Sequence, residues 1–354
     1  MSSPSPTPLT VATHDGVGDD VLVAAWDALA QRDPAATLFQ RARWLGRWEG
    51  VLAGQRAMRT RTFHRDADGT DTGGDLVGVL VETRELLRLP SGPGELIRLA
   101  GGDEVTDYLG PLAAPEDRAD VADAYVATLA ADRGWDEVVL GGLAADTGWA
   151  ELFAEAAPRH GLGVVQANVE AVCPVVDLTG GIDGYLTRLP GRLRQELQRK
   201  ARKLTRDAGP FEVHAYAPAD TLQGVEDFLT QVRAGDDDGK AAFFRRPEME
   251  GWFRTLAEEY GPDGTLRVHR LDVGSIRAAM TVSLVEGERW GLYNSSFDPS
   301  LGALAPGMVL VRELVDRAAD EGCTTFDLLR GDEPYKYRFG AVDRELRTLT
   351  LVRT

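Results

Sequence analysis

The residues whose types best suit chemistry lie close together, within residues 326–340. Asp327 ends a predicted strand there, and the adjacent pair Tyr335 and Lys336 follows eight residues later. A phenol titrates near ~10 and a thiol near ~8.5, so a tyrosine is suited to protonating a leaving thiolate. A lysine can bind a phosphate or a carbonyl oxygen, and an aspartate can orient that lysine, hold an amine or form a structural ion pair with a nearby arginine. Together these side chains offer a proton donor, a cation and a carboxylate within one short stretch.

A strand, a loop and a helix precede this stretch and would position it. Residues 290–297 are aromatic and β-prone, and the run ends at Asp298-Pro299. Pro306 suits the first turn of a helix, and apolar residues then recur at helical spacing until Gly322. The N-terminus of such a helix presents free backbone N–H groups and a partial positive charge, which suit a pyrophosphate. Strand–loop–helix units are common and most bind nothing, so this feature alone predicts no site.

Three motifs carry a resemblance to a known family: Pro306-Gly307, Phe326-Asp-Leu-Leu-Arg-Gly331 and Tyr335-Lys-Tyr-Arg-Phe-Gly340. They resemble the branch of the GNAT acyltransferase superfamily that contains the CelD-like and Fem-type transferases, in which two GNAT folds share one chain. The resemblance implies an α/β (α+β mixed sheet) fold with two tandem domains, a degenerate N-terminal GNAT-like domain over 1–174 and an acyltransferase domain over 175–354. One departure is the segment 301–307, which is poorer in glycine and arginine than the family's phosphate loop.

The resemblance also implies which residues take part in the reaction. It places catalytic roles on Tyr335, Lys336, Asp327 and Asn294. For Asn294 the simpler alternative is a cap at the end of a strand. The implied contacts to the cofactor are Tyr293, Ser295, Ala305, Gly307, Met308, Val309 and Arg338. The implied co-substrate is acetyl-CoA or another acyl-CoA, with no metal, and the acceptor is an unidentified amine or sugar-linked small molecule.

The order of predicted elements agrees with this fold. Across residues 175–330 the pattern gives strand, helix, helix, three strands, helix, strand, which is the GNAT order. The first half shows a degraded version of the same order. The segment 107–111 of that half also resembles a recurrent family segment, and it is either a tight turn or part of a cleft lining.

A basic amphipathic helix is predicted over residues 192–206. Its seven basic residues oppose only Glu196, and Leu193, Leu197 and Leu204 fall on one face. The helix is either a solvated face or a surface that guides an anion, such as the phosphates of coenzyme A or the acceptor end of an RNA. It therefore keeps open a Fem-type alternative in which the acyl donor is an aminoacyl-tRNA. A net charge of −17 opposes that tRNA partner, because neutralising phosphates drives such binding.

Composition limits the remaining possibilities. The 354 residues suggest about two domains, and 43% hydrophobic with 27% charged residues is ordinary for a globular protein. No apolar run approaches the ~20 residues of a membrane span, and the N-terminus does not resemble a signal peptide. Cys173 and Cys323 are expected as buried thiols, which favours the cytoplasm. The oligomeric state is not indicated.

Other chemistry is poorly supported by the sequence. His269 lies on a predicted central strand as a base or, more simply, as a core histidine. The acidic loop 236–240 is either solvent-exposed or a lid that attracts an amine cation. The polar turn 66–74 lacks the final glutamate of a calcium loop, so no metal is expected. A third hypothesis, a non-catalytic binding module, remains because the 301–307 segment matches the phosphate loop only loosely.

Overall fold

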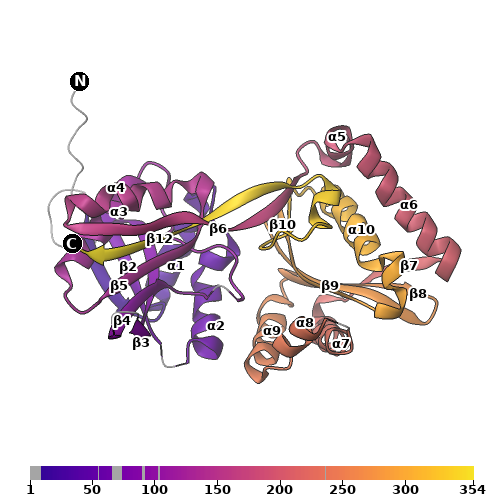
Figure 1. Ribbon diagram of the computed structural model, residues 1–354, viewed down its shortest axis with the longest axis horizontal. Helices are drawn as coiled ribbons and strands as arrows, with labels where there is room; N and C mark the ends of the chain where they lie inside the picture. Colours follow the sequence, from indigo (N-terminus) through magenta and orange to yellow (C-terminus); the bar gives the residue numbers. More distant parts are fainter. Residues whose placement is uncertain (1–8, 55, 66–73, 90–91, 103, 236) are drawn as a thin grey trace. The chain divides into compact units, whose positions relative to one another are not determined.

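The computed structural model describes residues 9–354 except 55, 66–73, 90–91, 103 and 236 (Figure 1). The predicted polar turn 66–74 therefore lies, apart from Gly74, outside the described residues. The chain divides into two compact units: unit 1 is Met1–Val172 with Arg344–Thr354, and unit 2 is Cys173–Asp343. The sequence placed the C-terminal residues in the second domain, but they pair with a strand of unit 1 and belong to its fold.

Unit 1 holds a mixed sheet covered by helices. Its strands are β1 (Thr10–Asp15), β2 (Ala57–Arg65), β3 (Asp75–Leu89), β4 (Gly92–Leu99), β5 (Glu137–Ala144) and β12 (Val342–Arg353). Strands β1 to β4 pair antiparallel, β4 and β5 pair parallel, and β5 pairs antiparallel with β12. Its helices are α1 (Asp20–Arg32), α2 (Ala42–Leu52), α3 (Arg118–Ala131) and α4 (Trp149–Arg159).

Unit 2 repeats this arrangement. Its strands are β7 (Phe211–Ala215), β8 (Leu266–Val273), β9 (Ile276–Glu286), β10 (Arg289–Phe297), β11 (Thr325–Asp327) and the end of β6 (Leu162–Asp177). Strands β7 to β10 pair antiparallel, β10 and β11 pair parallel, and β11 pairs antiparallel with β6. Its helices are α5 (Gly181–Arg188), α6 (Gly191–Ala208), α7 (Thr221–Arg233), α8 (Asp238–Phe243), α9 (Pro247–Tyr260) and α10 (Pro306–Asp320).

The two faces of the unit 2 sheet are covered by different helices (Figure 1). Helix α10 packs against the sheet on one face, with α5 and α6 beside it, and α7 to α9 cover the other. The core on the α10 side joins Leu310 and Leu314 to Trp290 and Phe326 of the strands. The apolar spacing that predicted α10 is therefore the stripe that it buries.

The last strand of each unit is exchanged. β6 begins in unit 1, and its end, Val175–Asp177, pairs with β11 of unit 2. β12 begins at the end of unit 2 and pairs with β5 of unit 1. The predicted mixed fold with tandem domains is confirmed, although the first half carries the full strand order and not the degraded copy that its sequence suggested.

The described residues contain neither a membrane-spanning helix nor a metal-binding cluster. Within the described parts of the chain, no helix combines the length and the apolar character that crossing a membrane requires. Nor do the described histidine, cysteine, aspartate and glutamate side chains gather into a group that would hold a metal ion.

Candidate active site

The two central strands of unit 2 separate partway along their length. β10 pairs with β11 only from Arg289–Thr325 to Gly291–Asp327, where β11 ends. β10 continues to Phe297, held on its other edge by β9. A bulge at Tyr293 shifts the β9–β10 register between Leu292 and Asn294, and a bulge re-aims the backbone around it. Beyond Gly291, this edge of β10 is therefore not paired with β11.

The N-terminus of α10 follows this edge through a short 3₁₀ turn, Pro299–Leu304. Ala305 precedes the helix in the left-handed conformation, with φ at 53°, and no side chain caps the helix. Pro306 occupies the first position, as the sequence predicted. A Cβ at Gly307 would make only an ordinary contact with Phe297, so the backbone there is open to close approach. Uncapped N–H groups with a helix dipole behind them suit a phosphate group.

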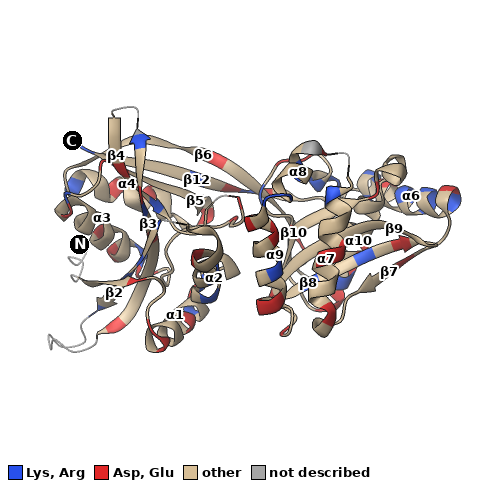
Figure 2. Ribbon diagram, turned by 90° about the horizontal axis from the view of Figure 1, so that it is seen from below, with Lys and Arg blue, Asp and Glu red and all other residues tan. Residues whose placement is uncertain are grey.

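The basic helix α6 contacts the turn that leads into α10. Basic residues recur along its length (Figure 2). The Lys203 ammonium donates to the backbone carbonyl of Ala303, 3.0 Å away, within that turn. Arg199 and Arg202 of the same helix are exposed. The buried leucines predicted for this helix, Leu193, Leu197 and Leu204, anchor it in the core. The basic face therefore lies beside the N-terminus of α10.

Tyr335 meets the open edge of β10 from the segment after β11. Its hydroxyl hydrogen-bonds with the Ser295 side chain, and burial raises the pKa of Tyr335 to about 12. The sequence predicts a phenol pKa close to that of a thiol. The difference between about 12 for Tyr335 and ~8.5 for a thiol instead corresponds to about 5 kcal/mol for full proton transfer. Tyr335 is therefore better suited to donating a hydrogen bond to a leaving sulfur than to protonating it outright.

Lys336 is committed to the backbone. Its ammonium donates to the carbonyls of Leu329, Arg330 and Gly331 at 2.9, 2.8 and 3.1 Å, and it lies 2.9 Å from the Glu333 carboxylate. An ammonium has three hydrogens, and the three carbonyls account for all of them. The side chain is 4% exposed. These contacts hold the 329–331 turn in shape. In this arrangement the ammonium has no further hydrogen to donate to a phosphate or a thioester carbonyl.

Asp327 is also engaged in that turn. The fully buried carboxylate accepts from the Leu329 backbone N–H at 2.8 Å and faces the Arg289 guanidinium at 3.4 Å. Leu329 has φ at 56°, which costs a non-glycine residue about 1–2 kcal/mol. An ion pair of the kind that the sequence considered exists, with Arg289 of β10. Asp327 therefore fixes the end of β11.

The remaining predicted residues fall into two groups. Asn294 accepts from the Ser295 backbone N–H at 3.0 Å, which is a local cap. The Tyr293 hydroxyl accepts from the Trp252 indole at 3.0 Å, and its ring stacks on Phe253, so the side chain faces α9. Arg338 pairs with Glu196 of α6 at 3.5 Å. For Tyr293 and Asn294 only the backbone faces the open edge.

The tip of α10 contributes through its backbone in the same way. Val309 is buried in the core, and Met308 packs against it. The backbone N–H groups of both donate to the Ala305 carbonyl, at 3.1 Å from Met308 and 3.3 Å from Val309. Ala305, Gly307, Met308 and Val309 are therefore brought together as one turn, as predicted.

Two residues near the site behave differently from the sequence interpretation. The sequence predicts an exposed or lid-like acidic loop over residues 236–240. In the structure, Lys240 lies on α8 and its ammonium donates to the Ser295 carbonyl. His269 is the core histidine: burial lowers its pKa to about 3, and its ring packs 5.6 Å from that of Trp290. The lysine was missed because the surrounding aspartates dominate the local pattern.

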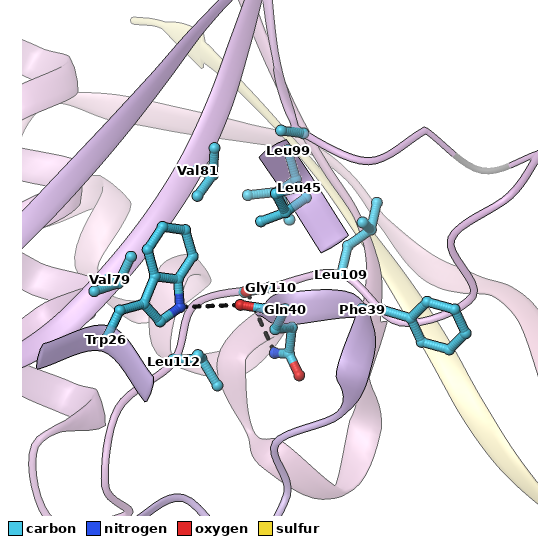
Figure 3. Close-up of a pocket in the computed structure, with 11 residues that line it drawn as sticks. Trp26, Phe39, Gln40, Leu45, Val79, Val81, Leu99, Leu109, Gly110 and Leu112 are labelled. Atoms are coloured by element: carbon cyan, nitrogen blue, oxygen red, sulfur yellow. Dashed lines mark hydrogen bonds between the residues drawn. The ribbon is translucent and has the colours of Figure 1, made fainter. Parts of the chain in front are cut away.

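The equivalent opening in unit 1 is filled by the chain itself. Leu112 pairs with Val79 of β3, and Leu109 pairs in parallel with Leu143 of β5, beyond the end of β4. Gln40 holds the segment by donating to the Gly110 carbonyl at 3.3 Å (Figure 3). One cavity beside the segment is about 10 Å³, the size of a single water, and a second of about 250 Å³ is lined by Leu99, Leu109 and Val139. The segment 107–111 is therefore paired with the neighbouring strands as part of a plug, and its Leu109 also lines the larger cavity.

Comparison with known proteins identifies the second unit. Residues 191–337 match the family model described as an acetyltransferase (GNAT) domain. The second unit is therefore a GNAT acyltransferase domain. The sequence matches none of the curated proteins with which it was compared.

Solved structures extend the likeness to the whole chain. FemX is similar at a TM-score of 0.64 and 11% identity, over 92% of this chain and 95% of FemX. The C-terminal domain of a putative lysylphosphatidylglycerol synthetase from Agrobacterium fabrum gives 0.53 and 12%, over 93% and 91%. L-PGS from Bacillus licheniformis gives 0.52 and 10%, over 92% and 90%. At these identities the likeness is one of fold, and it extends over both units.

Proposed function

We propose that unit 2 transfers an acyl group from acetyl-CoA or another acyl-CoA directly to the amine of a small molecule, including a sugar-linked one, within a ternary complex. The observation that carries this proposal is the end of β10–β11 pairing at Gly291 and Asp327, next to the bulge at Tyr293 and the uncapped start of α10. A pantetheine arm would pair with the free edge of β10 while its pyrophosphate meets the helix tip.

The residues divide the work as follows. Backbone N–H groups at the bulge, near Tyr293 and Asn294, would donate hydrogen bonds to the thioester oxygen as negative charge develops on it. This is the largest electrostatic contribution that such a site can make. Tyr335 would stabilise the departing thiolate by a hydrogen bond. Lys336 and Asp327 hold the turn that carries Tyr335 toward β10. Positioning of both substrates supplies much of the remaining rate enhancement, which is why few side-chain catalysts are needed.

Calorimetric titration with acetyl-CoA and longer acyl-CoAs tests the donor. The matched variants are Gly307→Glu at the start of α10 and Gly191→Glu at the start of α6, because both glycines have room for a Cβ and neither has positive φ. We expect Gly307→Glu to weaken acyl-CoA binding at least tenfold, since a carboxylate there repels the pyrophosphate, while Gly191→Glu keeps most of the affinity. No binding by any acyl-CoA in the series would reject the proposal.

A Fem-type transfer from aminoacyl-tRNA is the second candidate. Helix α6 favours it, because its exposed basic residues form a continuous face on an otherwise acidic protein. The net charge of −17 opposes it. This candidate requires salt-sensitive binding of charged tRNA that is lost when the exposed charges of α6 are reversed. Wild-type protein that binds no tRNA at low salt would remove it.

A binding module without catalysis is the third candidate. It remains because the 301–307 segment has only a loose likeness to the family's phosphate loop. Acyl-CoA binding without thiol release, in the presence of amino sugars, polyamines and amino acids as acceptors, would favour it. We retain the cytoplasm as the proposed compartment, since Cys173 and Cys323 are both free thiols.

A further inference from the structure

Lys240 reaches the open edge of β10 from the connection between α7 and α9. It lies on the short helix α8, which Asp237 caps by accepting from the Lys240 backbone N–H at 2.9 Å. The Lys240 ammonium donates to the backbone carbonyl of Ser295. The side chain of the same serine hydrogen-bonds with Tyr335. An amine and a phenol thus converge on one residue of β10, beyond the point where β11 stops pairing.

The surroundings of Lys240 withdraw it from water. Phe243 ends α8, and Phe244, the next residue, packs against Phe228 of α7 and Phe253 of α9. Burial lowers the pKa of Lys240 to about 8. The carboxylates of Asp237 and Glu333 act in the opposite direction, and Lys336 acts with burial.

Lysine is unusual in this chain. Of its 39 lysine and arginine residues, only four are lysines: Lys200, Lys203, Lys240 and Lys336. Arginine cannot lose its proton in a protein, whereas lysine can once it is buried. Lys203 donates to a carbonyl of the turn before α10, and Lys336 to three carbonyls after β11. A neutral Lys240 keeps two N–H donors for the Ser295 carbonyl and gains a free lone pair.

We propose that Lys240 is the proton acceptor of the acyl transfer, taking the proton from the attacking amine of the acceptor. The step rests on the function proposed above. The nitrogen–carbon bond to the acyl group forms, the carbon–sulfur bond breaks, and the thiolate leaves with the bonding electron pair. Lys240 takes the proton lost by nitrogen and returns it to solvent, from which the thiolate takes one. Amine and thioester become amide and thiol, with no other reactant.

The first test measures the titration of Lys240 without any substrate. The full chain is labelled with ¹³C at lysine Cε, which reports the protonation of Nζ, and Lys240→Gln assigns the signal by removing it. We expect a midpoint near pH 8. Glu333→Gln should lower that midpoint further, because it removes a negative charge near the ammonium, whereas Glu248→Gln on α9 should not. A midpoint near the ordinary lysine value of ~10.4 would overturn the proposal.

The second test separates a catalytic lysine from a merely buried one. Thiol release from acetyl-CoA is followed across pH with amino sugars, polyamines and amino acids as acceptors. We expect kcat/KM of the wild type to level off above pH 8, and Lys240→Met and Lys240→Arg each to lose about 10²-fold or more without weaker acyl-CoA binding. Variants that keep the wild-type rate and profile would overturn the proposal. Absence of acyl-CoA binding would instead refute the proposed function. The NMR titration measures the pKa of Lys240 without substrate, so its result does not depend on that function.

Discussion

Replacing Lys336 by methionine should loosen the 329–331 turn far more than a surface lysine change would. The variant keeps the length of the side chain but leaves the carbonyls of Leu329, Arg330 and Gly331 without the ammonium, which lies within 2.8–3.1 Å of all three. A hydrogen bond from a charged donor contributes about 1.5–3 kcal/mol, and removing one partner of a buried ionic group costs about 3–5 kcal/mol. Because the three carbonyls share one ammonium, we take about 3–5 kcal/mol for the set.

Hydrogen exchange read by mass spectrometry measures this loss locally. Peptides covering 328–340 should exchange about two to three powers of ten faster in Lys336→Met, since each ~1.4 kcal/mol is tenfold, while unit 1 peptides stay unchanged. Lys200→Met on α6 is the matched control. Lys336→Arg should resemble Lys336→Met, because a planar guanidinium cannot direct donors at three converging carbonyls. A change below tenfold in Lys336→Met would refute the positioning role and return Lys336 to direct catalysis.

Three further predictions follow from the site and its core. Burial lowers the pKa of His269 to about 3, so below pH 6.5 the unfolded chain binds a proton that the folded chain does not. Urea titrations should therefore show the free energy of unfolding falling by about 2 kcal/mol between pH 6.5 and 5. His269→Leu should lack this pH-dependent fall. Lys203→Glu, beside the start of α10, should weaken acyl-CoA binding at least tenfold in calorimetry, whereas Arg192→Glu, about 16 Å away along α6 and beyond the Debye length, should have little effect. Tyr335→Phe removes only the hydroxyl, so thiol release should show kcat reduced about 10–100-fold with the affinity for acyl-CoA kept, and an unchanged kcat would exclude a bond to the thiolate.

The sequence predicted those parts of unit 2 whose pattern is local. The apolar and basic spacing of 192–206 predicted α6, which runs Gly191–Ala208, and Pro306 marked the start of α10. The motif residues fall on β11 and the turn after it, where the candidate site lies. Their roles were harder to predict. Which carbonyls converge on Lys336, and that Arg289 faces Asp327, depend on how a turn and a neighbouring strand fold together.

Long-range pairing accounts for what the sequence analysis missed. Strand β12 was not predicted, and its exchange into unit 1 depends on pairing with β5, about 200 residues earlier in the chain. Lys240 was hidden among aspartates, although two local signals point to it. It is one of only four lysines, and the apolar run Ala-Ala-Phe-Phe follows it directly. Neither signal predicts burial of the amine by itself, because the burial depends on Phe244 packing against α7 and α9.

The length of one connection explains why the two halves, alike in strand order, differ in what they offer a ligand. Between β4 and α3 the chain has residues 100–117, enough to leave the sheet and return at Leu109 and Leu112 to pair with β5 and β3. Between β10 and α10 it has only residues 298–305, most of which form the 3₁₀ turn that leads straight into the helix. A segment that short cannot re-enter the sheet, since its residues are already used in reaching the helix. The segment in unit 1 gains apolar burial at Leu112 and paired backbone, while in unit 2 β10 continues beyond the end of its pairing with β11, where the function proposed above places the acyl donor.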